Sequence, residues 1–419
     1  MARITARCLS AFLAVACTLL FTAAAAQTAG LPAPASAAPA MAAPAPPAFS
    51  APTRPAPNHP GEYLWPVVRL YNTDYVDLRD LAKRYGLKTV WEKRDEILRL
   101  EDATGVLLRF ESHNRDFHLE GVRIFMGETA VYSRGSLFIS KIDLIKTILP
   151  LLNPGEHANQ LPPPPRLIVL DPGHGGSDPG KQNLTLHLNE KDMTLDVALR
   201  LKKLLESRGY RVLLTRSDDR YVELDQRPWI ATQAKADLFV SIHFNALPLA
   251  VAATVSGTET YSMTPQFMLS TTLENDKTMR GTSYAGNKQD YANTILSFVL
   301  HRQIIRELKT SDRGLKRYRL AVLRSPECPA VLIESAFLSN NVEGKKVGTP
   351  EFRQQIAAAM ADGIDAYSAL LARLHPPAAP ETHPAPATPA PATPATAAPV
   401  APVTTPPATR SAAPAPSPR

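Results

Sequence analysis

Three apolar runs of strand length stand out in the second half of this 419-residue chain, and each leads to a side chain that can bind a metal or move a proton. Residues 167–170 lead into a glycine-rich turn that carries His174, residues 238–243 end on His243, and residues 330–334 end on Glu334. Continuous apolar runs are typical of strands buried on both faces of a parallel sheet. The carboxyl ends of parallel strands meet at one edge, where ligands bind, so we expect these side chains to converge.

Helical stretches separate the predicted strands along the second half of the chain. We expect helices at 189–208, 224–236, 291–308 and 351–374, and further strands at 211–215 and 258–262. Strands that alternate with helices predict an α/β fold. The expected architecture is an open, mostly parallel (mixed) sheet with helices on both faces, spanning 166–374 and preceded by a small α+β domain.

The two ends of the chain have a different composition. Many of the 40 prolines and much of the alanine fall in residues 27–60 and 375–419, which predicts disordered Ala/Pro-rich segments that cannot bury enough apolar surface to fold. Residues 1–26 have a basic start, an apolar stretch and the small-residue site Ala24-Ala25-Ala26, which is typical of a secretory signal peptide. The alternatives are an uncleaved membrane anchor and lipidation at Cys17.

The net charge argues against a nucleic-acid-binding protein, and the cysteine content excludes a disulfide-stabilised one. The net charge of +7 is spread along the chain without the basic blocks that nucleic-acid binding favours, so we expect no nucleic acid as partner. Two of the three cysteines lie in the predicted signal peptide, which leaves Cys328 alone in the mature chain and excludes an intrachain disulfide.

Residues 61–153 predict a small α+β module, followed by a Pro-rich spacer at 154–165. The module has a strand, a helix that begins with Asp77-Leu78-Arg79-Asp80-Leu81, several strands, and a second helix after Gly135-Ser136-Leu137-Phe138-Ile139-Ser140. This order resembles the copper amine oxidase N-terminal-like domain found on secreted bacterial proteins. The resemblance implies no copper in this chain.

Four side chains form the predicted site. His174 and His243 lie at strand ends, and Glu190 lies at the entrance of a helix that Asn189 can cap, with Asp192 and Asp196 as alternative third ligands. A catalytic zinc needs only three protein ligands, because it keeps one position open. Glu334 directly follows an apolar run, where a carboxylate is costly to bury unless it is paired or used in proton transfer.

The motifs around these residues resemble those of one enzyme family. Leu170-Asp171-Pro172-Gly173-His174-Gly175-Gly176, Asn189-Glu190-Lys191, Ser241-Ile242-His243-Phe244-Asn245-Ala246 and Val331-Leu332-Ile333-Glu334-Ser335-Ala336-Phe337 follow one another in the order typical of the zinc-dependent N-acetylmuramoyl-L-alanine amidases of the amidase_3 type. The resemblance covers residues 166–374. It departs from the family pattern at Ala336, where a glycine is common.

The resemblance implies roles for the candidate residues. His174, Glu190 and His243 would bind Zn²⁺, and Glu334 would be the catalytic glutamate that takes a proton from water and returns it to the leaving amine. The substrate would be peptidoglycan, cleaved between N-acetylmuramic acid and L-alanine. The enzyme would be exported to the periplasm or the extracellular cell wall of a bacterium, and a protein activator is left open.

Two other functions fit the same residues. The first is a different zinc amide hydrolase, such as a peptidase, and the second is a non-catalytic wall-binding protein. Asp171 and Asn245 are candidates for orienting the imidazoles, with turn or cap roles as the alternative. We expect structural ion pairs for Arg216 and Arg227. Residues 246–287 follow His243 and would form a lid or inhibitory plug, or else a plain surface loop.

Overall fold

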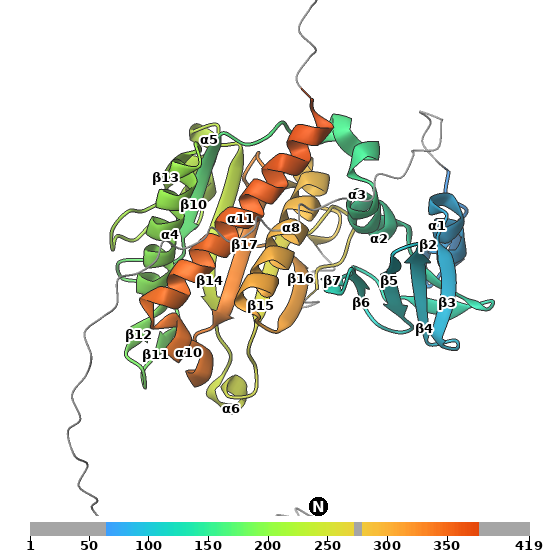
Figure 1. Ribbon diagram of the computed structural model, residues 1–419, viewed down its shortest axis with the longest axis horizontal. Coiled ribbons are helices and arrows are strands. Elements are labelled where there is room, and N and C mark those ends of the chain that lie inside the picture. The colour runs from blue at the N-terminus through green and yellow to red at the C-terminus, as the bar shows by residue number, and fades with distance from the viewer. Residues whose placement is uncertain (1–63, 272–278, 377–419) are drawn as a thin grey trace, which may run out of the picture. The chain divides into compact units, whose positions relative to one another are not determined.

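The computed structural model describes residues 64–271 and 279–376 (Figure 1). The predicted signal peptide, the Ala/Pro-rich segment 27–60 and nearly all of the predicted tail lie outside these ranges. The described residues all belong to one unit of the chain that begins at Ala48. Within the described part, every helix is too short or too polar to cross a membrane.

The sheet that carries the candidate site has the strand order β13-β10-β14-β17-β15-β16. Strands β13, β10, β14 and β17 run parallel, β15 is antiparallel to β17, and β16 is parallel to β15. The mixed, mostly parallel sheet predicted from the sequence is therefore confirmed. Its strands are β10 (Leu167–Pro172), β13 (Arg211–Leu214), β14 (Leu238–Asn245), β15 (Thr258–Met263), β16 (Asp312–Tyr318) and β17 (Ala330–Phe337).

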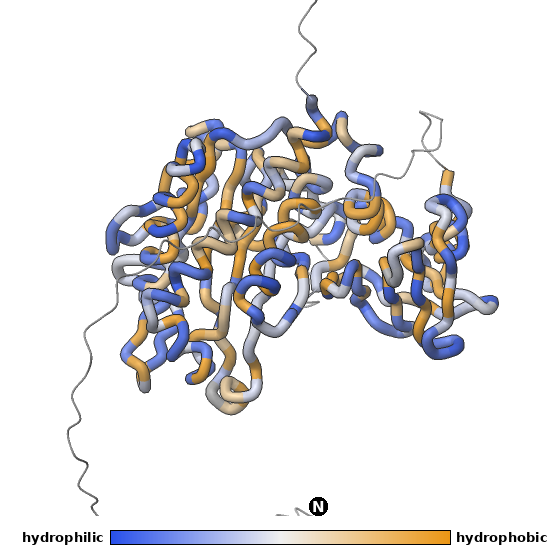
Figure 2. The backbone as a smooth tube through the Cα atoms, in the orientation of Figure 1, coloured by the Kyte–Doolittle hydropathy of each residue, from blue (hydrophilic) through white to orange (hydrophobic). Residues whose placement is uncertain are grey.

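Helices cover both faces of this sheet, because successive residues of each buried strand point to opposite sides. Ile168, Val240 and Ile333 pack in the core under α4, α8 and α11, whereas Val169 and Phe239 pack in a second core with residues of α5 and α9. Figure 2 shows these central strands as hydrophobic along most of their length. The helices of this half are α4 (Glu190–Ser207), α5 (Gln226–Gln233), α6 (Leu249–Ala252), α8 (Asp290–Leu308), α9 (Ala321–Arg324), α10 (Asn341–Val347) and α11 (Pro350–Leu374), with a short 3₁₀ helix η3 (Ala285–Gln289).

The N-terminal part of the described chain is an α+β structure with two groups of antiparallel strands. One group is a sheet of order β1-β2-β9-β8, and the other runs β7-β6-β5-β4-β3. The strands are β1 (Val68–Leu70), β2 (Thr73–Asp77), β3 (Lys88–Lys93), β4 (Ile97–Asp102), β5 (Gly105–Glu111), β6 (Asp116–Leu119), β7 (Val122–Phe125), β8 (Val131–Ser133) and β9 (Ser136–Ser140). The helices are α1 (Leu78–Tyr85), α2 (Lys141–Asp143), the π-helical turn η1 (Leu144–Ile148), α3 (Leu149–Leu152) and the 3₁₀ helix η2 (Pro154–Gln160).

Strand β7 joins this N-terminal part to the large sheet. Ile124 of β7 pairs with Leu315 of β16 in parallel register, so the eleven strands from β13 to β3 form one sheet. The Arg123 N–H donates a 2.8 Å hydrogen bond to Asp312, and Arg302 forms a 2.6 Å ion pair with Glu120. These contacts of the N-terminal part hold β16 in place, and side chains of β16 reach toward the candidate site.

Candidate functional site

The structure brings His174, Glu190 and His243 together at the carboxyl edge of the sheet. His174 follows β10, His243 lies on β14, and Glu190 is the first residue of α4. One donor atom from each of the three lies within 4.8 Å of the others. The Glu190 carboxylate faces both imidazoles, with Oε2 at 3.1 Å from His174 Nε2 and Oε1 at 2.9 Å from His243 Nδ1.

Backbone N–H groups fix the buried Glu190 carboxylate. Lys181 N donates to Oε2 at 2.8 Å and Phe244 N donates to Oε1 at 3.0 Å. Burial alone would raise the pKa of Glu190, but hydrogen bonds and charge from the two imidazoles hold this pKa well below its usual value. The carboxylate is therefore held ionised, as a metal ligand must be.

The other two acids considered for this position make different contacts. Asp192 accepts a hydrogen bond from the Asn189 side chain, and Asp196 binds Arg200 and Arg353. The expected cap is wrong, because the Asn189 side chain makes no capping hydrogen bond to the helix. Glu190 is instead held in place by the turn at Lys181 and by β14.

The turn that presents His174 has an unusual backbone. His174 has a φ of 62°, in the left-handed region that few residues other than glycine adopt. A Cβ atom on Gly173 would lie 2.2 Å from His243 Cε1, and one on Gly180 would lie 2.5 Å from His174 Cδ2. Glycine at these two positions lets the strand ends approach closely enough for the imidazoles to meet.

Two buried arginines hold this turn through its carbonyl groups. Arg216 donates to the carbonyl oxygens of Pro172 and Gly173 at 3.0 and 2.9 Å. Arg227 donates to those of Pro172 and His174 at 2.8 and 2.9 Å, and it also pairs with Asp171 at 2.8 Å. The ion pair expected for Arg227 is confirmed. The interactions that hold Arg216 in the structure are hydrogen bonds to backbone carbonyls and to the Thr194 hydroxyl.

A carboxylate that the sequence reasoning missed orients His174. Asp178 Oδ2 lies 2.7 Å from His174 Nδ1, which leaves Nε2 facing Glu190. The residues considered for this role contact other groups: Asp171 accepts from Thr215, Ser241 and Arg227, and the Asn245 amide donates to Glu259. An acid four residues after a histidine on a glycine-rich turn is the signal that could have found Asp178.

Glu334 lies on β17 directly beside His243 of β14 in the strand register. It lines the same cavity as the three clustered side chains, but its Oε2 atom is buried and has no hydrogen-bond partner among the described residues. Burial first, and then the negative charges of Glu190 and Glu259, raise the pKa of Glu334 well above its usual value. A carboxyl group in this state is suited to accept and return a proton.

A second glutamate lies opposite Glu334 on the neighbouring strand. Glu259 of β15 pairs with Glu334 in the antiparallel register, and two like charges in this position repel one another. Lys316 and Arg313 of β16 bind Glu259 Oε1 at 2.6 and 2.9 Å and neutralise this charge. Strand β16, which the sequence reasoning did not predict, therefore supplies the cations behind Glu334.

The cavity over these residues has a volume of about 670 Å³. Acids and imidazoles form one part of its wall, and apolar side chains such as Leu224, Tyr318 and Leu320 form another. From the described part of the segment 246–287, only Ala246 and Tyr261 line the cavity. In these described residues, the segment does not cover the site.

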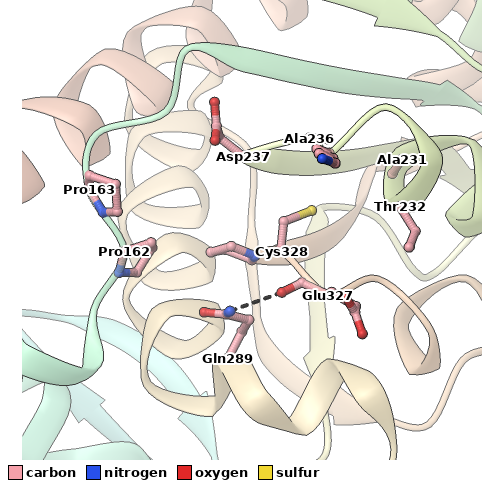
Figure 3. A pocket seen from close by; sticks show the side chains of 11 residues that line it. Pro162, Pro163, Ala231, Thr232, Ala236, Asp237, Gln289, Glu327 and Cys328 are labelled. Carbon is pink, nitrogen blue, oxygen red and sulfur yellow. Dashed lines mark hydrogen bonds between the residues drawn. The ribbon is translucent and has the colours of Figure 1, made fainter.

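A second cavity, drawn in Figure 3, lies at the opposite ends of the strands. Its lining includes Pro163, Asp237 and Pro329, which precede β10, β14 and β17, and Gln289 donates a hydrogen bond to the Glu327 carbonyl across it. Burial raises the pKa of the Cys328 thiol in its wall to about 12. This thiol is therefore protonated and not nucleophilic at neutral pH.

At one edge of an α/β sheet, the structure thus places two histidines and a buried glutamate that could hold a metal ion, with the carboxyl group of Glu334 in the same cavity. Residues 168–366 match the family model Amidase_3, N-acetylmuramoyl-L-alanine amidase. The chain belongs to this family. Among its relatives, AmiC of Neisseria meningitidis is 33% identical over 54% of this chain, but the match spans only 57% of that protein.

Other relatives are covered more fully. AmiA of Escherichia coli K12 is 31% identical over 48% of this chain and 76% of its own length, and YqiI of Bacillus subtilis is 34% identical over 48% and 84%. The solved catalytic domain of the amidase CwlV from Bacillus (Paenibacillus) polymyxa is 30% identical, with 48% of this chain and 97% of that chain covered and a TM-score of 0.40.

Proposed function

We propose that this protein is a zinc-dependent N-acetylmuramoyl-L-alanine amidase that hydrolyses the amide bond between N-acetylmuramic acid and L-alanine in peptidoglycan. The observation that carries the proposal is the placement of Glu334 in one cavity with His174, Glu190 and His243, in a chain of the amidase family. The predicted signal peptide supports export to the periplasm or cell wall. The domain boundaries given above, including the copper amine oxidase N-terminal-like module at 61–153, are part of this proposal.

The donor set fits zinc. Two imidazole nitrogens and a carboxylate oxygen are ligands that zinc prefers, and three protein ligands leave a position for the substrate or water. One donor atom from each of the three side chains lies within 4.8 Å of the others, so His174, Glu190 and His243 could hold one ion together. Bound zinc would polarise the scissile carbonyl and make a water molecule more acidic.

The residues of the chain itself would perform the proton transfers. Glu334 would accept the proton of the attacking water and would return it to the amine of L-alanine as the amide bond breaks. Within the described part of the chain its Oε2 has no hydrogen-bond partner, so this oxygen is available for the exchange. Asp178 would keep Nε2 of His174 directed at the metal.

The test is to incubate the purified chain with muropeptides, with and without a chelator, and to identify the products by mass spectrometry. We expect free stem peptides with an N-terminal L-alanine, and no such product after chelation. Cleavage within the stem peptide would replace the proposal with a zinc peptidase. Intact substrate that binds tightly to the metal-loaded protein would favour a wall-binding protein.

Replacing Arg216 by lysine is expected to weaken zinc binding about tenfold or more, the usual effect of losing a group that positions a metal ligand. Lysine keeps the charge, but its ammonium group cannot reach the carbonyls of Pro172, Gly173 and Lys191 together as the guanidinium does. Zinc affinity is measured by competition with a chromogenic chelator. Arg220→Lys, at an exposed arginine, is the control, and equal affinity in both variants would contradict the role of Arg216.

A further inference from the structure

Lys181 is a lysine in the wall of the candidate active site that the proposed mechanism does not use. It lines the cavity together with His174, Glu190, His243 and Glu334, and its side chain is half-buried. The hydrogen bond from its backbone N–H to Glu190 Oε2, at 2.8 Å, holds its backbone beside the metal ligands. Lys181 therefore places a positive charge within one side-chain length of the reacting groups.

The ammonium group of Lys181 differs from the other lysines and arginines around the site. Lys191 pairs with Asp219 at 2.7 Å, and Lys316 pairs with Glu259 at 2.6 Å. Arg216 and Arg227 donate hydrogen bonds to carbonyl groups of the turn that presents His174. Across residues 64–271 and 279–376, no carboxylate lies within 4.0 Å of the Lys181 ammonium, and no hydrogen bond of its Nζ is present.

We propose that Lys181 binds a carboxylate on the peptide side of the scissile amide. This inference rests on the proposed amidase function. The N-acetylmuramic acid side of that bond carries no charge, because its lactyl carboxyl group is part of the amide itself. The nearest carboxylate belongs to the second residue of the stem peptide, and this group occurs either free or as a carboxamide.

The local chemistry favours a free carboxylate over its carboxamide. A lysine ammonium is a point charge that forms strong, charge-assisted hydrogen bonds to a carboxylate but only a weak one to an amide oxygen. The structure thus assigns Lys181 as a residue that determines substrate specificity.

The experiment compares two soluble muropeptides that differ only at the second stem residue, one with a free carboxylate and one with a carboxamide. We measure kcat/KM for both with the full zinc-loaded chain, with Lys181→Met and with Lys181→Arg. For the unmodified chain, we expect the free carboxylate to be preferred roughly tenfold or more, the scale of a charge-assisted hydrogen bond. In Lys181→Met the ratio should fall to about one, and Lys181→Arg should keep most of the preference.

The control is Lys203→Met, at an exposed lysine of α4 outside the cavity, which should keep the preference of the unmodified chain. Zinc content and melting temperature are measured for every variant, so that misfolding is recognised. A fall in kcat for both substrates by the same factor in Lys181→Met would overturn the proposal. It would mean that Lys181 acts on the carbonyl group of the scissile amide and not on the carboxylate of the second stem residue. Equal use of both substrates by the unmodified chain would also overturn it, whereas failure to cleave either one would refute the amidase function itself.

Discussion

Replacement of Glu334 by glutamine is expected to lower kcat for stem-peptide release roughly a thousandfold, within the range that general acid–base catalysis contributes. Glutamine keeps the shape of the side chain but cannot accept and return the proton. The melting temperature should stay the same or rise, because the substitution removes a buried carboxyl group that faces Glu259 and whose Oε2 has no hydrogen-bond partner among the described residues. Product release is followed by chromatography, and unfolding is followed by thermal denaturation.

Glu343→Gln is the matched control for this experiment. Glu343 is also buried, but its carboxylate accepts hydrogen bonds from the N–H groups of Gly257 and Phe337 and lies outside the cavity. We expect this variant to lose stability, by about 1–3 kcal/mol, and to keep its kcat per folded molecule. The two glutamates should therefore give opposite results. Activity in Glu334→Gln comparable with the unmodified chain, at equal zinc content, would remove Glu334 from the mechanism.

The elements that position the site could be predicted because their signals are local. The apolar runs that become β10, β14 and β17 are continuous, and the helices between them have the right lengths, as the close match of the 189–208 prediction to α4 shows. Parallel strands align their carboxyl ends, so the meeting of His243 and Glu334 followed from the strand ends alone.

The supporting contacts could not be predicted because they depend on register and turn geometry. Arg216 and Arg227 lie about forty to fifty residues from the turn that they hold, and nothing in their local sequence shows which carbonyls they meet. The pairing of Glu259 with Glu334 depends on β15 running antiparallel to β17, at the point where the strand direction in the sheet reverses. A periodicity argument identifies a strand, but it does not give the neighbour of that strand or the residue opposite each side chain.

The joining of the N-terminal part to the large sheet is a further example. In the sequence, a Pro-rich stretch separates residues 61–153 from residues 166–374, and the pattern of each part predicts a separate domain. The bridge between Ile124 and Leu315 is a contact between distant segments. It matters for the site because β16 carries Arg313 and Lys316, which neutralise Glu259 beside Glu334.

Replacement of His243 by alanine is expected to abolish both stem-peptide release and the stabilisation of the fold by zinc. A ligand that binds only the folded state adds about 2.7 kcal/mol of stability at one hundred times its Kd and about 4.1 at one thousand times. For the unmodified chain, this corresponds to a melting temperature roughly 5–10 °C higher with excess zinc than with a chelator. Without His243 only two of the three clustered ligands remain, so the difference should be close to zero.

His187→Ala is the control, since His187 is an exposed residue between strands β11 (Gln182–Asn183) and β12 (Leu188–Asn189) and is not part of the metal cluster. This variant should show the same zinc-dependent rise in melting temperature as the unmodified chain. The comparison separates specific binding from general effects of zinc on histidines at the surface, because each variant lacks one imidazole. If His243→Ala kept the full zinc-dependent rise, the metal would bind elsewhere, and the assignment of His174, Glu190 and His243 as its ligands would be wrong.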